Sequence, residues 1–173
     1  ITALTEDSKA GRLCNQRFDF IRDTIARSHP WNCLTIRTSL AADSAAPEFE
    51  FTKQFTLPTD PFCLRVLSLS NPDILFRIEG RKLICNEDTI QMSYIGRITD
   101  INDYDALLIA TISAYLAAVI AYPLVASSAL RDRMTAEAAQ KMREARFVDA
   151  SEDNQINTSV LGDSRTLAAD TFI

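Results

Sequence analysis

The chain has 173 residues, a formal net charge of −5 and a sequence pI of about 4.9, and 47% of its residues are hydrophobic. This length fits one compact domain with an appendage, and the composition excludes disorder over the whole chain. Proteins that grip nucleic acid usually carry a basic face for the phosphates, so the acidic balance argues against that function. The chain starts at Ile1 with no signal-peptide pattern, and we expect a few residues ahead of it.

The first predicted helix extends from about residue 9 to residue 28. Its apolar residues recur at the spacing that places them on one helix face, namely Ala10, Cys14, Phe18, Ile21 and Ile25. Asp7 and Ser8 are the candidate N-caps. Pro30 ends the helix because proline disfavours the helical conformation of the residue before it.

Residues 33–99 predict a small, mostly antiparallel β module. Leu34, Ile36, Thr38 and Leu40 alternate with their neighbours at the period of a half-buried strand. Five more strands are expected near residues 49–57, 65–69, 74–78, 83–85 and 90–99. Phenylalanines at 49, 51 and 55 favour a sheet core over base stacking. Gly80 suits a tight hairpin turn between two of the strands.

Two further helices are predicted, at residues 102–122 and 125–148, with Pro123 between them. The first is apolar on more than one face, so we expect it to be buried between other elements. Thr111 and Ser113 interrupt its apolar run, which argues against a membrane span. Three carboxylates bracket its start, and we expect helix capping there rather than a cation site: Asp100, Asp103 and Asp105.

The pattern therefore predicts an α+β protein. Its parts are a helical bundle of long helices, a β module inserted between the first and second helices, and an extended C-terminal tail. Residues 1–150 are expected to form the domain and residues 151–173 the tail. Such a polar segment cannot offset the entropy of its own ordering, so we expect it to lie against a partner. The candidate partner-binding residues are Phe147, Val148, Ile156, Val160, Leu161, Leu167 and Phe172.

The sequence offers no credible active site, and we predict no enzyme, cofactor or metal. His29 is the only histidine, whereas zinc sites need several His or Cys ligands; we interpret it as a junction residue. Cys33 lies four residues later, but the expected change from helix to strand argues against a catalytic pair. The four glycines are too scattered for a phosphate-binding loop. The four cysteines contain no C-x-x-C pair, and we expect reduced core thiols.

Residues 8–41 combine a helix motif with a strand-start motif. The helix motif has the form A-x-x-x-(C/L)-x-x-x-(Y/F)-x-x-x-R-D, and the strand-start motif has the form H-P-W-N-(F/C)-x-x-x-R. The positions are Ala10, Cys14, Phe18, Arg22 and Asp23, then His29, Pro30, Trp31, Asn32, Cys33 and Arg37. This stretch closely resembles the opening of the tail tubular protein A family, the head-to-tail adaptors of podovirus-type bacteriophages.

Further matches to that family follow in order along the chain. They comprise Leu57-Pro58, Cys63 to Val66, Phe76 to Arg81, Tyr94 to Asp100, Leu116 to Leu124, and Glu144 to Ala150. The resemblance covers roughly residues 8–152 and leaves the tail unmatched.

The resemblance implies a non-enzymatic structural protein of the virion tail, assembled in the bacterial host cytoplasm. It implies a homo-oligomer, a dodecameric ring between the portal protein and the tail nozzle protein, with a docking surface for the tail fibre. DNA would pass through the channel without sequence-specific binding, and no membrane is involved. A ring needs two different faces on each subunit. We also expect an acidic lumen to repel DNA phosphates.

A second function stays open at this point. The same features suit a small non-enzymatic interaction module, monomeric or dimeric, that binds one protein partner through its C-terminal tail. The number of subunits in the assembly separates the two hypotheses.

Overall fold

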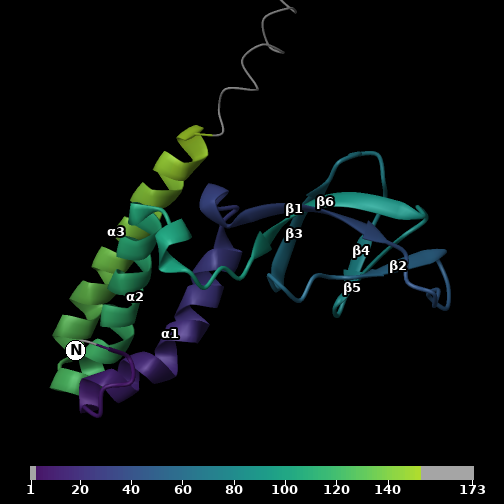
Figure 1. Ribbon diagram of the computed structural model, residues 1–173. Helices are drawn as coiled ribbons and strands as arrows, with labels where there is room; N and C mark the ends of the chain where they lie inside the picture. Colours follow the sequence, from purple (N-terminus) through teal and green to yellow (C-terminus); the bar gives the residue numbers. More distant parts are fainter. Residues whose placement is uncertain (1–2, 153–173) are drawn as a thin grey trace, which may run out of the picture.

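The computed structural model describes residues 3–152 (Figure 1). Within them the chain has three α-helices and two small antiparallel sheets, so the predicted mixture of helices and antiparallel strands is confirmed. The helices are α1 (Lys9–Ser28), α2 (Ala106–Val125) and α3 (Ser128–Glu152). The strands are β1 (Thr35–Ala41), β2 (Lys53–Thr56), β3 (Cys63–Leu69), β4 (Arg77–Glu79), β5 (Lys82–Cys85) and β6 (Thr89–Gly96). Single 3₁₀ turns lie at Asn32–Leu34 and Ile101–Asp103.

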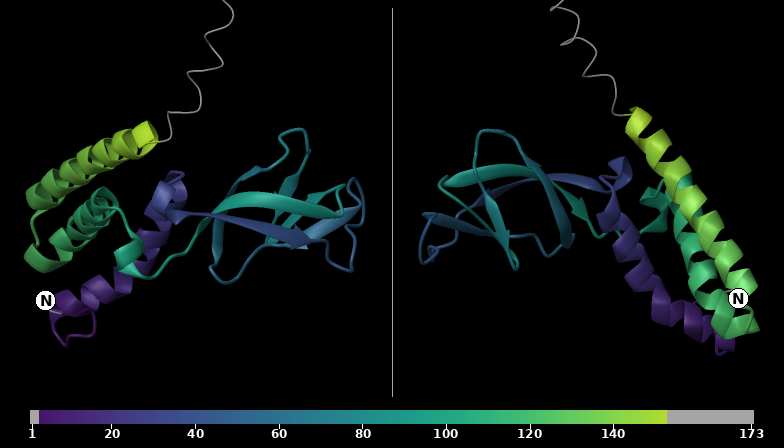
Figure 2. Two further views of the ribbon diagram at one scale, coloured as in Figure 1. Left: turned by 45° about the horizontal axis from the view of Figure 1, so that its top comes forward. Right: turned by 180° about the vertical axis from the view of Figure 1, so that it is seen from behind.

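The molecule is elongated, with the helices at one end and the strands at the other (Figures 1 and 2). Helices α2 and α3 lie side by side and antiparallel, and α1 packs on α2. The five expected tail contacts at Ile156, Val160, Leu161, Leu167 and Phe172 lie outside the described residues.

Helix α1 follows the predicted pattern. Ser8 caps it, because the Gly11 N–H donates to Ser8 Oγ at 3.0 Å. The buried face carries Gly11, Cys14, Ile21, Ile25 and Ala26. The helix ends at Ser28, directly before the His29-Pro30 pair.

The strands form two sheets, with orders β1-β6-β3 and β2-β5-β4. The predicted hairpin at Gly80 is confirmed: it joins β4 to β5, and Gly80 has a φ of +57°. The predicted aromatic strand is shorter than expected. Phe55 is fully buried, whereas Phe49 lies outside β2 with 75% of its surface exposed. Glu50 has a φ of +67°, a left-handed conformation that no extended strand allows.

Two cores divide the molecule. One lies between the sheets and includes Phe55, Leu83 and Tyr94. The other lies among the helices and includes Trp31 and Ile95, both completely buried. Ile95 belongs to β6, so that strand contributes to both cores and fixes the sheets against the helices.

Helix α2 departs from the prediction in three ways. It starts at Ala106, capped by Asp105, while Asp100 caps the 3₁₀ turn before it. Pro123 lies inside its last turn and does not end it; the end comes at Ala126, whose N–H donates to the Tyr122 carbonyl at 2.8 Å. A proline this close to the end removes only one terminal hydrogen bond.

Helix α3 continues beyond the expected domain boundary at residue 150, to Glu152.

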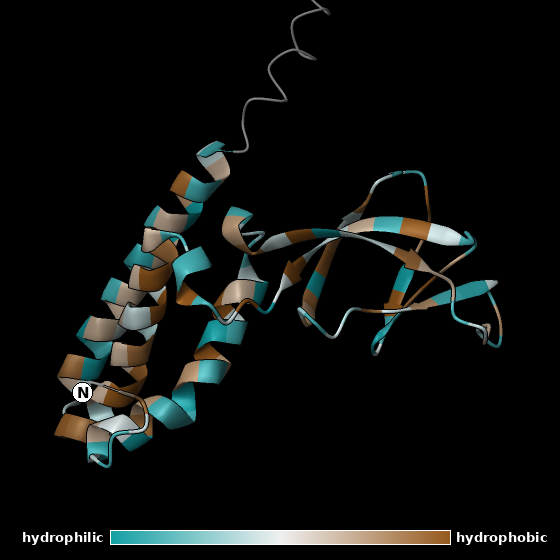
Figure 3. Cartoon of the chain, in the orientation of Figure 1, coloured by the Kyte–Doolittle hydropathy of each residue, from teal (hydrophilic) through white to brown (hydrophobic). Residues whose placement is uncertain are grey.

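The third difference is the exposure of part of α2. The helix packs between α1 and α3, as expected, but apolar side chains on it also remain exposed. Its buried residues are Leu108, Thr111, Ile112, Ala118 and Ala121. By length and composition alone α2 could cross a membrane, and the polar interruptions expected to forbid this do not break the helix. Figure 3 shows it as the most continuously hydrophobic of the three helices.

Replacing Gly11 by alanine tests the close approach at the start of α1. A Cβ atom at this position would lie 2.4 Å from the Glu6 carbonyl oxygen, so backbone must move. We expect Gly11→Ala to lower the free energy of unfolding by about 1–3 kcal/mol, although alanine is the better helix former. Chemical denaturation followed by Trp31 fluorescence measures it. The exposed Gln16→Ala is the control, and an unchanged midpoint for Gly11→Ala contradicts the packing described.

Candidate partner-binding surfaces

A hydrogen-bonded latch joins the end of α3 to the end of α1. His29 Nε2 lies 2.9 Å from Asp149 Oδ2, and the two side chains are 15% and 10% exposed. The Asn32 N–H donates to Asp149 Oδ1 at 3.0 Å, and Asn32 Nδ2 donates to the Asp149 carbonyl at 2.9 Å. The structure thus brings together His29 and Asn32 of one motif and Asp149 of another. The carboxylate accepts two bonds, and the latch sets the direction in which α3 ends.

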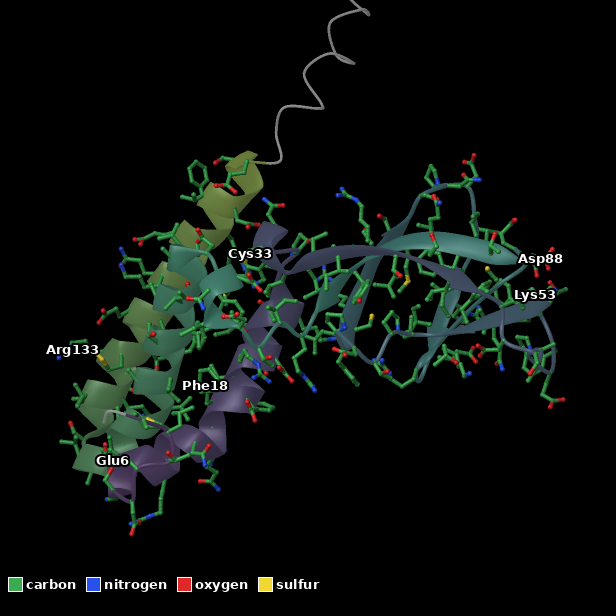
Figure 4. All side chains as sticks on the ribbon, in the orientation of Figure 1. Glu6, Phe18, Cys33, Lys53, Asp88 and Arg133 are labelled. Carbon is green, nitrogen blue, oxygen red and sulfur yellow. The ribbon has the colours of Figure 1, made fainter. Side chains whose placement is uncertain are left out.

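Cys33 is the cysteine closest in sequence to the latch. A nucleophilic cysteine needs a depressed pKa, but burial first, and then the Asp149 and Asp105 carboxylates, raise the pKa of the Cys33 thiol. Figure 4 shows Cys33 at the junction of helices and strands. Within residues 3–152 no three metal-ligating side chains are grouped. The arrangement fastens two helix ends together.

The last turns of α3 expose the two described residues of the predicted partner-binding set. Phe147 is 78% exposed and Val148 is 41% exposed. On the opposite side of the same turns, Asp149 is held by the latch, and Arg146 donates to the Ser28 carbonyl at 3.3 Å. The exposed Phe147–Val148 pair therefore lies on a helix end whose other side is held by hydrogen bonds to the end of α1.

A second surface lies on α2 and was not anticipated. The helix contains no charged residue, and apolar side chains stay exposed along its length. The exposed fractions are 42% for Ile109, 42% for Val119, 52% for Tyr122 and 60% for Val125. We call these four residues the α2 surface. Its sequence signal was the run of apolar residues on more than one helix face, which we interpreted as burial between other elements.

Comparison of the sequence with models of protein families and with curated proteins finds no match to either. The likeness to phage adaptors therefore rests on the motifs quoted above.

Removing the Asp149 carboxylate tests the latch. We expect Asp149→Ala to lower the free energy of unfolding by about 2–3 kcal/mol, because a half-buried N–H of Asn32 and His29 lose their acceptor. Asp149→Asn keeps an acceptor oxygen and should cost less. Urea denaturation measures both. The exposed Glu152→Ala is the control, expected within about 0.5 kcal/mol of the parent; equal midpoints for all three would show that the latch contributes nothing.

The labelling rate of Cys33 tests the exclusion of a catalytic pair. Iodoacetamide attacks the thiolate, so a raised pKa moves the rise in rate to higher pH. We expect the midpoint for Cys33 to lie above that of a short cysteine peptide, measured by mass spectrometry of the labelled peptide. A midpoint below the peptide's would reveal an activated thiol and restore the pairing with His29.

Proposed function

We propose that this chain is a non-enzymatic structural subunit of a short-tailed phage, the head-to-tail adaptor that forms a ring between portal and nozzle. The observation that carries the proposal is the α2 surface: an uncharged helix with four exposed apolar residues needs a cover. The sequence motifs at residues 8–41, which resemble those of phage adaptors, support the adaptor as the function of this assembly. The finer layout, a helical bundle with an inserted β module, and the number of twelve subunits belong to this proposal.

A protein cover for α2 is favoured over a membrane by its neighbour. Helix α3 packs along α2 and carries charged side chains throughout. They are Arg131, Asp132, Arg133, Glu137, Lys141, Arg143, Glu144, Arg146, Asp149 and Glu152. Each Arg, Lys or Asp at the centre of a bilayer costs about 2.5–3.5 kcal/mol. Inserting α2 would therefore drag these charges into lipid or separate two helices that share a core.

The geometry also suits a ring better than a symmetric dimer. A closed ring of many subunits uses two different patches, one meeting the other on the next copy. The α2 surface and the Phe147–Val148 pair are two such patches on different helices. In the proposed ring the portal lies on one side and the nozzle on the other, and the ring offers a docking surface for the fibre. DNA passes through an acidic lumen without sequence-specific binding.

The exposed Phe147–Val148 pair supports one alternative. A monomeric or dimeric interaction module could bind a single partner through the end of α3 and the tail that follows it. This alternative leaves the α2 surface without a cover, and for that reason we place it second.

The mass of the purified protein, alone and with a portal ring present, separates the two functions. Assembly into a ring of many subunits in either condition supports the adaptor. A chain that stays monomeric or dimeric in both conditions contradicts it and favours the interaction module. Deleting residues 153–173 in an assembling protein then shows whether the tail is needed to hold the portal.

A charge placed on the α2 surface should abolish assembly and leave the fold intact. Val119 is 42% exposed, so the stem of a lysine can lie along the helix and keep its ammonium in water until another subunit covers it. We expect Val119→Lys to shift the mass distribution from the ring to the monomer at unchanged circular dichroism. The matched control is Ala136→Lys, on the exposed side of α3. Full assembly of Val119→Lys would show that the α2 surface is not an interface.

A further inference from the structure

An exposed phenylalanine is held at the tip of the loop before β2. We call residues 46–50 the aromatic loop. The Phe51 N–H donates to the Phe49 carbonyl at 2.8 Å across Glu50, whose φ is +67°. This is a γ-turn of the strained kind, which persists only where the surroundings enforce it. An exposed ion pair of 2.9 Å between Glu50 and Arg77 of β4 accompanies the turn and ties it to the sheet.

The aromatic loop therefore presents a fixed apolar anchor between two acidic residues. Phe49 is 75% exposed, with Glu48 and Glu50 on either side. An exposed Phe49 side chain does not stabilise the core of its own chain, although the backbone next to it is strained. Buried aromatic anchors of this kind dominate the binding energy of interfaces.

A pocket of opposite character lies where α1 meets β3 and the β4–β5 hairpin. Its volume is about 400 Å³, and Arg27, Arg65 and Arg81 line it. Within residues 3–152 none of these three guanidinium groups pairs with a carboxylate, because each donates to main-chain carbonyls. We call it the arginine pocket. Asp23 also lines the pocket, but its carboxylate pairs with Arg22 and Arg97. The three other arginines therefore leave the pocket positively charged in a chain whose net charge is −5.

Aromatic and aliphatic side chains form the rest of the wall of the arginine pocket. Two guanidinium groups lie over the Phe62 ring, with Arg81 Cζ at 3.9 Å and Arg97 Cζ at 4.5 Å from its centroid. Arg81 is fixed by bonds to three carbonyls, and Ile78 supplies an exposed aliphatic wall. A preformed pocket of this composition fits a carboxylate beside an aromatic ring.

The loop and the pocket lie on opposite faces of β4. Ile78 lines the arginine pocket, whereas its neighbour Glu79 lines the hollow beside Phe49. Successive strand residues point to opposite faces, so one copy presents the loop on one side and the pocket on the other. Two complementary patches on different faces are what a heterologous, head-to-tail contact requires.

We propose that the aromatic loop of one copy docks in the arginine pocket of a second copy of this chain. Phe49 then packs against Phe62 and Ile78, and Glu48 pairs with Arg27 or Arg65. We favour another copy of this chain as the partner because its aromatic loop carries the acidic residues and the phenylalanine ring that complement the arginine pocket. This contact deepens the proposed ring and rests on it, adding a strand-to-strand joint to the one between helices.

Crosslinking between two different variants tests the contact. One chain carries Ala46→Cys, which leaves Phe49 in place, and the other carries Ile78→Cys. The two are mixed before assembly and oxidised, so an intrachain disulfide between these positions is impossible. We expect a disulfide-linked dimer in the mixture and none in either variant alone. The control mixture pairs Glu87→Cys, on the exposed β5–β6 turn, with Ile78→Cys and should not crosslink. Three native cysteines are buried and Cys33 is half-buried.

Substitutions in the aromatic loop test its strength without touching either core. We expect Phe49→Ala to weaken association by about tenfold or more, measured by mass distribution against protein concentration, while the exposed Leu75→Ala leaves it unchanged. Glu48→Arg should weaken association in the same way, unlike Glu87→Arg. Mixing Glu48→Arg with Arg27→Glu should recover the contact, because the charges again match across it.

The outcomes separate this inference from the adaptor proposal. If rings of full mass form without the crosslink, the loop contact is wrong and the adaptor proposal stands. The same conclusion holds if an acidic segment of another protein is found in the pocket. A crosslink in open chains of indefinite length supports the contact and overturns the closed ring. A chain that stays monomeric with and without the portal overturns both.

Discussion

The burial of Trp31 is the constraint on which the rest of the structure depends. The side chain is completely buried, and its Nε1–H donates to the Ile25 carbonyl at 3.0 Å. That carbonyl lies in the last turns of α1, where helix carbonyls lack partners within the helix. One large ring thus satisfies the helix end and fills the space that α1, α2, α3 and β6 share. Fully burying such a side chain contributes several kcal/mol, and the chain must leave α1 at this point to achieve it.

The latch follows from that exit. Because Trp31 turns inward, its neighbours His29 and Asn32 lie on the side where α3 ends, and Asp149 meets both. His29 also contacts Trp31 edge to face, with ring centroids 4.8 Å apart. Core packing around Trp31 and the hydrogen-bonded latch are therefore one unit. This unit brings together two motifs that lie more than a hundred residues apart in the sequence. A structural role accounts for every contact that the only histidine makes.

Local signals predicted local structure well. The amphipathic spacing of α1, its Ser8 cap and the Gly80 hairpin each depend on neighbours in sequence, and the structure bears them out. Pro123 shows the limit: proline disrupts a helix interior, but its effect depends on how far the helix would otherwise continue. The phenylalanine run shows another, because alternation alone could not reveal the left-handed Glu50 or its ion pair to Arg77, a residue distant in sequence.

The candidate surfaces were harder to predict than the core for a physical reason. The same apolar residues signal burial whether a chain covers them itself or another chain does. Val119 and Tyr122 therefore looked like core, and only their exposure of 42% and 52% shows that the single chain leaves them open. The hydrogen bonds from Arg27 and Arg65 to main-chain carbonyls could not be predicted either. In an acidic chain the sequence does not indicate which arginines have no carboxylate partner.

Open apolar and charged patches on one chain constrain the assembly it can make. The latch joins the ends of α1 and α3, and Ile95 of β6 packs in the core among the helices, so the helical and strand ends that carry these patches are connected by packing. A rigid unit with unlike patches repeats one rotation at each contact, and that rotation decides between a closed ring and an open helix. Two joints, one between helices and one between strands, define this rotation far more tightly than one. A chain with a helical end and a strand end is thereby suited to close a ring of fixed size.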